Sequence, residues 1–290
     1  MSQTTVGFVG LGAMGSRMAA RLLQRGYDVV VHNRTREREA PLVALGARPA
    51  ESLAELAYAA DIVLGCLLHD AAVEEVYCGP HGLIANCRQD QVFVEHATFS
   101  PALARRITTD LEAGGASFVD APVSGGPEGA DAGTLTVMAG GAECAIARAA
   151  DIVDAYAARV LRVGPVGAGL TLKLVNQLLV TCHVAAAAEA ERLLRQLGVA
   201  NDSAAAVLTA SWGDSTMLRR MFTQRAMTER EQSAATIGGL REPQRLLSEL
   251  LTLHGLDLPV TASAVRMFDA ACAQGRGAHD LVDVLAGGDS

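Results

Sequence analysis

The segment Gly10-Leu11-Gly12-Ala13-Met14-Gly15 constrains this chain most, because it joins an apolar run at 5–9 to a periodic, helix-like run at 13–25. Glycines at this spacing allow a tight turn, close approach of the backbone to a pyrophosphate, and close packing of a helix on a strand. An anion can then bind the N-terminal amides of that helix. The segment therefore predicts a dinucleotide site, with Gly10, Leu11, Gly12, Ala13, Met14 and Gly15 as cofactor contacts.

Short β-branched runs alternate with alanine- and leucine-rich periodic segments up to residue 164. The predicted strands are 5–9, 28–32, 62–66, 91–95, 117–120, 134–139 and 160–164. The predicted helices are 13–25, 36–45, 52–59, 71–77, 101–114 and 142–156. Nearly continuous apolar strands separated by helices are typical of a buried parallel sheet. Residues 1–164 are therefore predicted to form a Rossmann-like, doubly wound α/β domain that binds the cofactor.

The pattern changes at the glycine-rich segment 164–169, after which no strand is expected. Residues 170–197 are predicted to form one interdomain helix of about 28 residues, or roughly 42 Å. Shorter helices are predicted at 201–210, 215–228, 242–254, 259–274 and 279–286. Residues 165–290 are therefore expected to be an all-helical domain for substrate binding and dimerisation.

Composition limits the kinds of partner that the chain is expected to bind. The chain carries 24 basic and 32 acidic residues, a formal net charge of −8, so we expect no nucleic-acid binding. Its six cysteines form no CxxC pair, which favours reduced thiols in the cytoplasm. No basic, apolar leader precedes the first predicted strand, so we expect no secretory signal. The most apolar stretch, 174–188, is interrupted by polar residues, so we expect no membrane span.

The end of the second predicted strand indicates which dinucleotide is bound. An acidic residue here would favour NAD, because it binds the ribose hydroxyls and repels a 2′-phosphate. This chain has the neutral Asn33, then Arg34, whose guanidinium can pair with a phosphate, and Thr35, which adds a hydroxyl. We predict NADP(H). The alternative is a solvated Arg34 at a helix start, with Thr35 as its N-cap.

Three further segments accompany the glycine motif: Thr-Phe-Ser-Pro at 98–101, Asp-Ala-Pro-Val-Ser-Gly-Gly-Pro at 120–127, and Gly-Ala-Gly-Leu-Thr-Leu-Lys-Leu-Val-Asn at 167–176. Together they resemble the β-hydroxyacid dehydrogenase family, which includes 3-hydroxyisobutyrate dehydrogenase, tartronate semialdehyde reductase and the glyoxylate/succinic semialdehyde reductases. The resemblance extends over nearly the whole chain. It implies an oxidoreductase that transfers hydride between NADP(H) and a small 3-hydroxy acid or semialdehyde.

Lys173 is the predicted general acid/base. It lies in an apolar stretch, where burial would lower its pKa, and it could donate a proton to a carbonyl oxygen or accept one from a hydroxyl. Asn176, three residues on, shares its helix face, and the resemblance implies that Asn176 orients the substrate. Gly169, one turn before Lys173, could admit a nicotinamide or a substrate close to the backbone. The alternative is a surface lysine that keeps its amine in water.

Ser124, Gly125 and Gly126 suit a substrate carboxylate, because glycine exposes backbone N–H groups and the serine hydroxyl adds a donor. The resemblance implies the same assignment, and it implies that Leu67, Leu68 and Thr98 border the cofactor. It matches Trp212 to a wall of the substrate pocket, although a single Trp could equally be core. The seven histidines show no ligand spacing, so no metal is expected.

One position departs from the family, whose members carry a cofactor-contacting lysine at the start of a late helix. Here strict spacing places Glu242 there, and a slip of one residue places Arg241, which we take as the cofactor contact. Two alternatives stay open, an imine reductase on the same fold and a non-catalytic NADPH-binding scaffold. Apolar helices of this kind usually need a partner surface, so we expect a homodimer or a dimer of dimers. The sequence does not name the hydroxy acid or the physiological direction.

Overall fold

The computed structural model describes residues 4–226 and 235–285. Its packing divides the chain into an N-terminal unit, Met1–Lys173, and a C-terminal unit, Leu174–Ser290. The division falls inside the long helix α8 (Ala168–Gln196). The first residues of α8 pack with the sheet, because Leu170 is fully buried in the same core as Phe118. The sequence prediction placed the boundary nine residues earlier, at 164/165 instead of 173/174.

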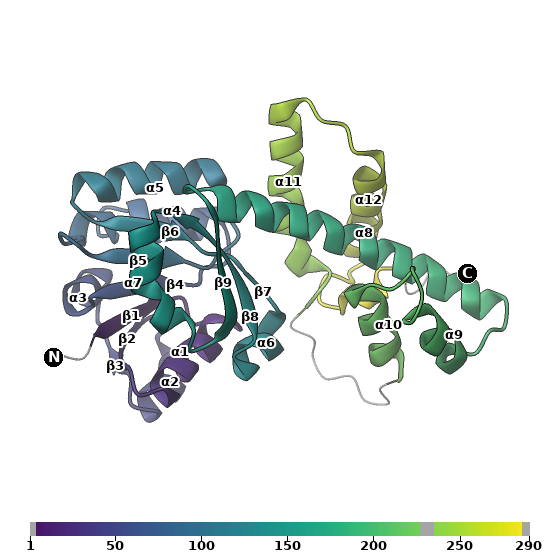
Figure 1. Cartoon of the computed structure of the whole chain (residues 1–290), viewed down its shortest axis with the longest axis horizontal. Coiled ribbons are helices and arrows are strands. Elements are labelled where there is room, and N and C mark those ends of the chain that lie inside the picture. Colours follow the sequence, from purple (N-terminus) through teal and green to yellow (C-terminus); the bar gives the residue numbers. More distant parts are fainter. Residues whose placement is uncertain (1–3, 227–234, 286–290) are drawn as a thin grey trace. The chain divides into compact units, whose positions relative to one another are not determined.

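The N-terminal unit is built on a nine-stranded sheet of order β3-β2-β1-β4-β5-β6-β8-β7, with β9 paired to β8 (Figure 1). The strands are β1 (Thr5–Val9), β2 (Asp28–His32), β3 (Arg48–Pro49), β4 (Ile62–Gly65), β5 (Val92–Glu95), β6 (Ser117–Asp120), β7 (Val123–Ser124), β8 (Leu135–Gly141) and β9 (Ala157–Gly164). Pairings from β3 to β6 are parallel. Strand β8 is antiparallel to β6 and β7 and parallel to β9.

Helices cover both faces of this sheet. They are α1 (Gly15–Gln24), α2 (Ala40–Ala44), α3 (Leu53–Ala59), α4 (Asp70–Cys78), α5 (Pro101–Ala113), α6 (Gly126–Ala132) and α7 (Glu143–Val153), with short 3₁₀ turns at Arg36–Arg38 and Ile84–Asn86. Alternate strand residues enter different cores: Val29 and Val31 pack with α1, α2, α6 and α7, whereas Val30 packs with α3, α4 and α5. The doubly wound α/β prediction is confirmed.

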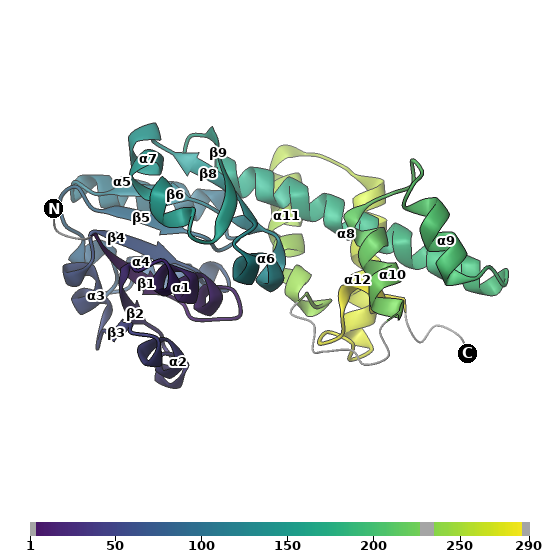
Figure 2. The same cartoon turned by 60° about the horizontal axis from the view of Figure 1, so that its bottom comes forward.

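The C-terminal unit is helical in its described part. After α8 come α9 (Asn201–Leu208), α10 (Thr216–Ala226), α11 (Arg241–His254) and α12 (Pro259–Ala273), with 3₁₀ turns at Gly238–Leu240 and Leu281–Asp283. Helices α8, α9, α10 and α12 share a core around the buried Phe268 (Figure 2). By length and composition alone α8 could cross a membrane, a criterion that core helices of soluble proteins also meet.

Several predicted elements differ in detail. The predicted helix 36–45 is a 3₁₀ turn followed by α2, and the predicted helix 279–286 is only the 3₁₀ turn Leu281–Asp283. Strands β3 and β7, helix α6 and the antiparallel pairings of β8 were not predicted. Residues 227–228 and 286 of two predicted helices lie outside the described residues.

Candidate active site

The three glycines after β1 have three different surroundings. Gly10 has a φ of +91°, which favours glycine, and a Cβ there would lie 2.5 Å from the Cys66 carbonyl oxygen. A Cβ on Gly15 would lie 2.0 Å from the Gly10 carbonyl oxygen. A Cβ on Gly12 would meet no atom within 4 Å. The loop is therefore shaped by Gly10 and Gly15 and leaves open space at Gly12, an arrangement that fits a dinucleotide pyrophosphate.

This loop lies where the order of the sheet reverses. Strand β1 pairs with β2 on one side and with β4 on the other, so the segments after β1 and β4 leave the sheet side by side. In open α/β sheets, ligands bind at this switch point, beyond the carboxyl ends of the strands. Leu67 and Leu68 follow β4 there, and Leu68 is 81% exposed. The structure thus brings these two predicted contacts to the glycine loop.

Glu95 connects the segment after β4 to the segment after its own strand, β5. Its Oε1 accepts hydrogen bonds from the N–H groups of Leu67 (3.1 Å) and Ala97 (2.9 Å). The residue is fully buried, and burial raises the pKa of its carboxyl to about 7. Thr98, the third predicted cofactor neighbour, directly follows Ala97 and is half-buried. Glu95 therefore fixes the two segments that carry Leu67 and Thr98.

Asn33 organises the turn after β2. Its Oδ1 accepts a hydrogen bond from the Leu11 N–H (2.8 Å), and its Nδ2 donates to the Thr35 carbonyl oxygen (2.8 Å). Its own N–H donates to the buried carboxylate of Glu39 (2.8 Å), which also pairs with Arg36 at 3.2 Å. The Asn33 amide therefore holds the glycine loop against the segment that contains Arg34.

The side chain of Arg34 is exposed, and no hydrogen bond or ion pair engages it within the described part of the chain. Thr35 precedes the 3₁₀ turn Arg36–Arg38, but its hydroxyl makes no capping hydrogen bond. Thr35 thus occupies the N-cap position by its extended backbone and not by its side chain, and the alternative of a solvated Arg34 at a helix start stays open. Both side chains are available to a ligand bound beside Asn33.

Ser124, Gly125 and Gly126 form a sharp turn between β7 and α6. Ser124 pairs with Thr136 of β8, while Gly125 and Gly126 have φ values of +136° and +68°. These conformations favour glycine. Helix α6 begins at Gly126, and no side chain caps its first turn. Free N–H groups at a helix start attract an anion, so this turn suits a small carboxylate.

Asp120 fixes the start of α8. Its Oδ1 accepts a hydrogen bond from the Gly167 N–H (2.7 Å), and its Oδ2 accepts one from the Leu170 N–H (2.8 Å). A Cβ on Gly169 would lie 2.2 Å from the Met138 carbonyl oxygen and 2.8 Å from Asp120 Oδ2. The prediction that Gly169 admits a nicotinamide or substrate is therefore wrong, because strand β8 and Asp120 already fill the space beside it.

Lys173 lies less than one turn after Leu170. It is only 8% exposed, and no hydrogen bond or ion pair holds its amine within the described residues. Burial lowers the pKa of this amine to about 8, so both protonation states are accessible near neutral pH. The alternative reading, a surface lysine, is wrong. Lys173 is also the only lysine among the 24 basic residues, a signal that the sequence analysis overlooked.

Asn176 and its neighbour Gln177 follow Lys173 on α8, in the segment that belongs to the C-terminal unit. Both are half-buried, and Asn176 Nδ2 donates to Gln177 Oε1 at 3.3 Å. Gln177 was not predicted, although a residue four positions after Lys173 shares its helix face as well as Asn176 does.

The remaining predicted residues belong to the C-terminal unit. Trp212 is 107% exposed, so its alternative reading as a core residue is wrong. Arg241 forms an ion pair with Asp269, and Glu242 accepts hydrogen bonds from Arg245 at 2.8 and 2.9 Å. Both residues that could replace the family's late lysine are thus engaged within their own unit.

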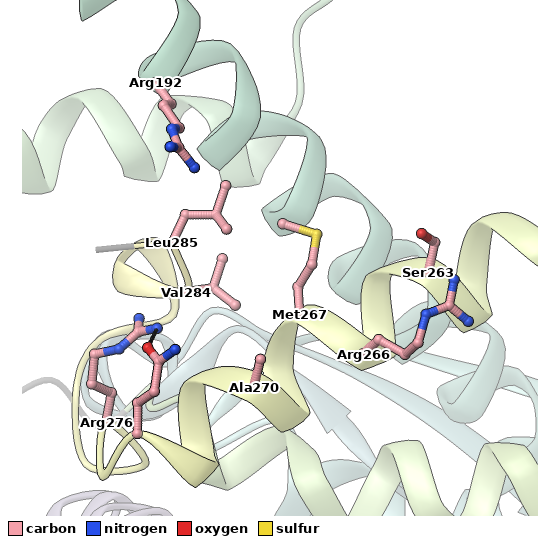
Figure 3. Close-up of a pocket in the computed structure, with 9 residues that line it drawn as sticks. Arg192, Ser263, Arg266, Met267, Ala270, Arg276, Val284 and Leu285 are labelled. Atoms are coloured by element: carbon pink, nitrogen blue, oxygen red, sulfur yellow. Dashed lines mark hydrogen bonds between the residues drawn. The ribbon is translucent and has the colours of Figure 1, made fainter. Parts of the chain in front are cut away.

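A cavity of about 330 Å³ lies in the C-terminal unit, among α8, α12 and the residues after α12 (Figure 3). Arg192, Met267, Arg276, Val284 and Leu285 are among its lining residues. It contains none of the predicted site residues. Across residues 4–226 and 235–285, no group of three or more His, Cys, Asp or Glu side chains is placed to hold a metal ion.

Comparison with known proteins shows which families this chain matches. Residues 5–164 match the family described as the NAD binding domain of 6-phosphogluconate dehydrogenase. Residues 167–286 match the family described as NAD-binding of NADP-dependent 3-hydroxyisobutyrate dehydrogenase. The 2-(hydroxymethyl)glutarate dehydrogenase of Eubacterium barkeri is 32% identical over 97% of this chain and 93% of its own.

Solved structures agree. A structure described as Psf3 in complex with NADP+ and 2-OPP has a TM-score of 0.90 at 28% identity, over 97% of this chain and 99% of that one. Mycobacterium tuberculosis 3-hydroxyisobutyrate dehydrogenase with L-serine has a TM-score of 0.88 at 26% identity, with both chains fully covered. An imine reductase from Pseudomonas sp., at 20% identity and a TM-score of 0.64, shares the fold alone.

The fold, the glycine loop and these matches define a nicotinamide-dependent oxidoreductase. The chain belongs to the β-hydroxyacid dehydrogenase family, as its motifs predicted. Its function is that of an NAD(P)-dependent 3-hydroxyacid dehydrogenase family member.

Proposed function

We propose that this protein is an NADP(H)-dependent reductase that converts a small semialdehyde or oxo acid to its hydroxy acid, and also catalyses the reverse reaction. The observation that carries the proposal is the buried amine of Lys173, which has no partner among the described residues and whose pKa is lowered to about 8. A proton-transfer group needs a pKa near the working pH. Retention of this lysine and of Ser124-Gly125-Gly126 disfavours the imine reductase and scaffold alternatives.

The bound nicotinamide supplies or accepts the hydride. Protonated Lys173 donates a hydrogen bond to the substrate carbonyl oxygen and transfers its proton as the alkoxide forms. In the oxidative direction the neutral amine accepts the hydroxyl proton. Because the amine has no competing partner within the described residues, its hydrogen-bonding capacity is available to the substrate.

The substrate carboxylate is proposed to bind the turn Ser124-Gly125-Gly126, whose backbone N–H groups and serine hydroxyl can donate hydrogen bonds to an anion. Asn176 is proposed to orient the substrate from the same helix as Lys173. Trp212 as a pocket wall and Arg241 as a cofactor contact remain proposals, and the ion pair of Arg241 with Asp269 would have to open first.

The preference for NADP(H) rests on the available guanidinium of Arg34 beside the neutral Asn33. The solved relative described with NADP+ supports the same choice. Thr35, also exposed, adds a hydroxyl to this proposed 2′-phosphate site.

We also propose that the protein forms a homodimer or a dimer of dimers in the cytoplasm. Its partner is proposed to be a small carboxylate-bearing substrate, with no nucleic acid or membrane. The face of α8 that carries Leu172, Val175 and Leu179 supports self-association, because these side chains are 42%, 44% and 48% exposed.

The test is oxidation of NADPH against a panel of small semialdehydes and oxo acids, with cyclic imines and the corresponding esters as comparison substrates. Lys173→Ala should lower kcat by about 10²–10⁴ and leave NADPH affinity nearly unchanged. Lys173→Arg keeps the charge but cannot release a proton, so it should be equally impaired. Wild-type kcat in either variant, or turnover of imines alone, would contradict the proposal.

A further inference from the structure

The strand that leads to the proposed carboxylate site and the helix that carries Lys173 are joined by one side chain. Asp120 ends β6, is fully buried, and accepts hydrogen bonds from the Gly167 and Leu170 N–H groups. Four residues on from Asp120 the chain reaches Ser124, and less than a turn on from Leu170 it reaches Lys173. Asp120 is therefore the short connection between the two groups that must hold opposite ends of one small substrate.

The carboxylate of Asp120 has almost no freedom to move. A Cβ on Gly140 of β8 would lie 2.4 Å from Asp120 Oδ1, and a Cβ on Gly169 of α8 would lie 2.8 Å from Oδ2. Asp120 pairs with Gly140 across the antiparallel β6–β8 contact. The carboxylate is thus held between β8 and α8, and two glycines provide its space.

Asp120 acts on Lys173 through the backbone at the start of α8 and not through its charge. Burial is the cause of the lowered Lys173 pKa, and burial and backbone N–H groups act on Asp120. Among the described residues no charged side chain contributes to either shift.

We propose that Asp120 is a positioning residue for the reaction: it sets the separation between the Ser124 turn and Lys173 by holding the start of α8 against β6 and β8. This rests on the proposed function of Lys173 and Ser124. A displacement of about 1 Å can cost on the order of 10²-fold in rate, so the connection matters even though Asp120 touches no substrate.

The surroundings of the Lys173 amine can be measured without any substrate. Because Lys173 is the only lysine, protein labelled with ¹³C-lysine has a single Cε resonance, whose pH titration gives the pKa of this amine. Asp120→Asn keeps the side-chain shape but removes the charge, and its NH₂ group must face one of two N–H donors. Burial alone lowers this pKa, so a start of α8 that is no longer held should expose the amine, and we expect the pKa of Lys173 to rise toward its ordinary value. Asp120→Ser, smaller and also neutral, should give the same direction and cannot clash.

The effect of Asp120 on the placement of Lys173 and Ser124 is measured as a change in kcat. In both Asp120 variants we expect kcat to fall about 10- to 100-fold, with NADPH affinity changed less than about threefold. The matched control is Asp61→Asn. Asp61 also accepts a hydrogen bond from a backbone N–H, that of Thr5 at 2.9 Å, but it lies at the amino end of β4, whereas Asp120 lies at the carboxyl end of β6. It should leave both kcat and the Lys173 titration unchanged.

The outcomes separate the two proposals. A folded Asp120 variant with wild-type kcat, or with an unshifted Lys173 titration, overturns the positioning role while the function assigned to Lys173 stands. A wild-type enzyme that Lys173→Ala does not impair overturns the proposed function, and the Lys173 titration then still reports whether Asp120 acts on the amine.

Discussion

Arg34 and Asn33 are neighbours in the sequence, but only the Arg34 side chain is available to a ligand. The Asn33 amide is held by Leu11 and Thr35, whereas the Arg34 guanidinium is exposed. A charge-assisted pair with a 2′-phosphate should favour NADPH over NADH by about 1.5–3 kcal/mol, or roughly 10- to 150-fold in kcat/KM. Arg34→Ala should lose most of this preference without harming the use of NADH.

Asn33→Asp tests the same site from the other side. Asp keeps the acceptor for the Leu11 N–H but brings a negative charge, so it should invert the preference toward NADH. Steady-state kinetics with both cofactors measure these effects, and Arg148→Ala, which removes an exposed arginine from α7, is the control. Equal kcat/KM for the two cofactors in the wild type would mean that Arg34 binds no phosphate.

Glu95 makes stability depend on pH. Its carboxyl has a pKa of about 7 when folded, above the ordinary 4.5, so the folded state binds this proton more tightly than the unfolded state. Wild-type protein should therefore lose stability as pH rises from about 4.5 to about 7. Glu95→Gln does not titrate, so its free energy of unfolding relative to wild type should rise over this window by up to about 3 kcal/mol.

Urea unfolding at about pH 5 and about pH 8 measures the difference. Glu112→Gln, an exposed carboxylate on α5, is the control and should show no such rise. A difference between wild type and Glu95→Gln that stays constant with pH would show that Glu95 titrates normally.

At the scale of elements, periodicity predicted what is long and regular. Strands β1, β2, β4, β5, β6 and β8 were predicted within a few residues because each is an apolar run buried on both faces. Strands β3 and β7 have two residues each, too few to show a period. Helix α6 has the sequence Gly-Pro-Glu-Gly-Ala-Asp-Ala, which lacks an apolar stripe, so it was read only as part of a turn.

The strand–turn–helix element gives its own prediction. Gly12→Ala adds a methyl group where no atom lies within 4 Å, so the thermal midpoint should not change. The methyl would occupy the proposed pyrophosphate space, and the Kd for NADPH should rise at least about tenfold. Gly15→Ala would instead meet the Gly10 carbonyl oxygen and should destabilise the fold by about 1–3 kcal/mol. A Gly12→Ala protein with wild-type affinity would place the dinucleotide elsewhere.

At the scale of the whole molecule, motifs pointed to candidate ligand contacts but not to the residues that hold them in place. The glycine loop, Asn33, Ser124 and Lys173 were predicted as contacts from motifs, because ligand-binding chemistry restricts residue type at fixed spacing. Glu95 and Asp120 were missed as site-forming residues, although each is an acidic residue that ends a buried strand. Their partners are backbone N–H groups of distant segments, and such contacts leave no pattern in the sequence.

The exposed face of α8 predicts that the protein self-associates. Leu172, Val175 and Leu179 are spaced three and four residues apart, so they form one apolar stripe. We expect the protein to sediment at a multiple of 30.1 kDa, and to do so at high salt, because apolar contacts are not screened. Val175→Glu with Leu179→Glu should give a folded monomer that still binds NADPH. Tyr58→Glu, at an 80% exposed position on α3, should leave the assembly intact. A wild-type monomer would remove α8 as the contact.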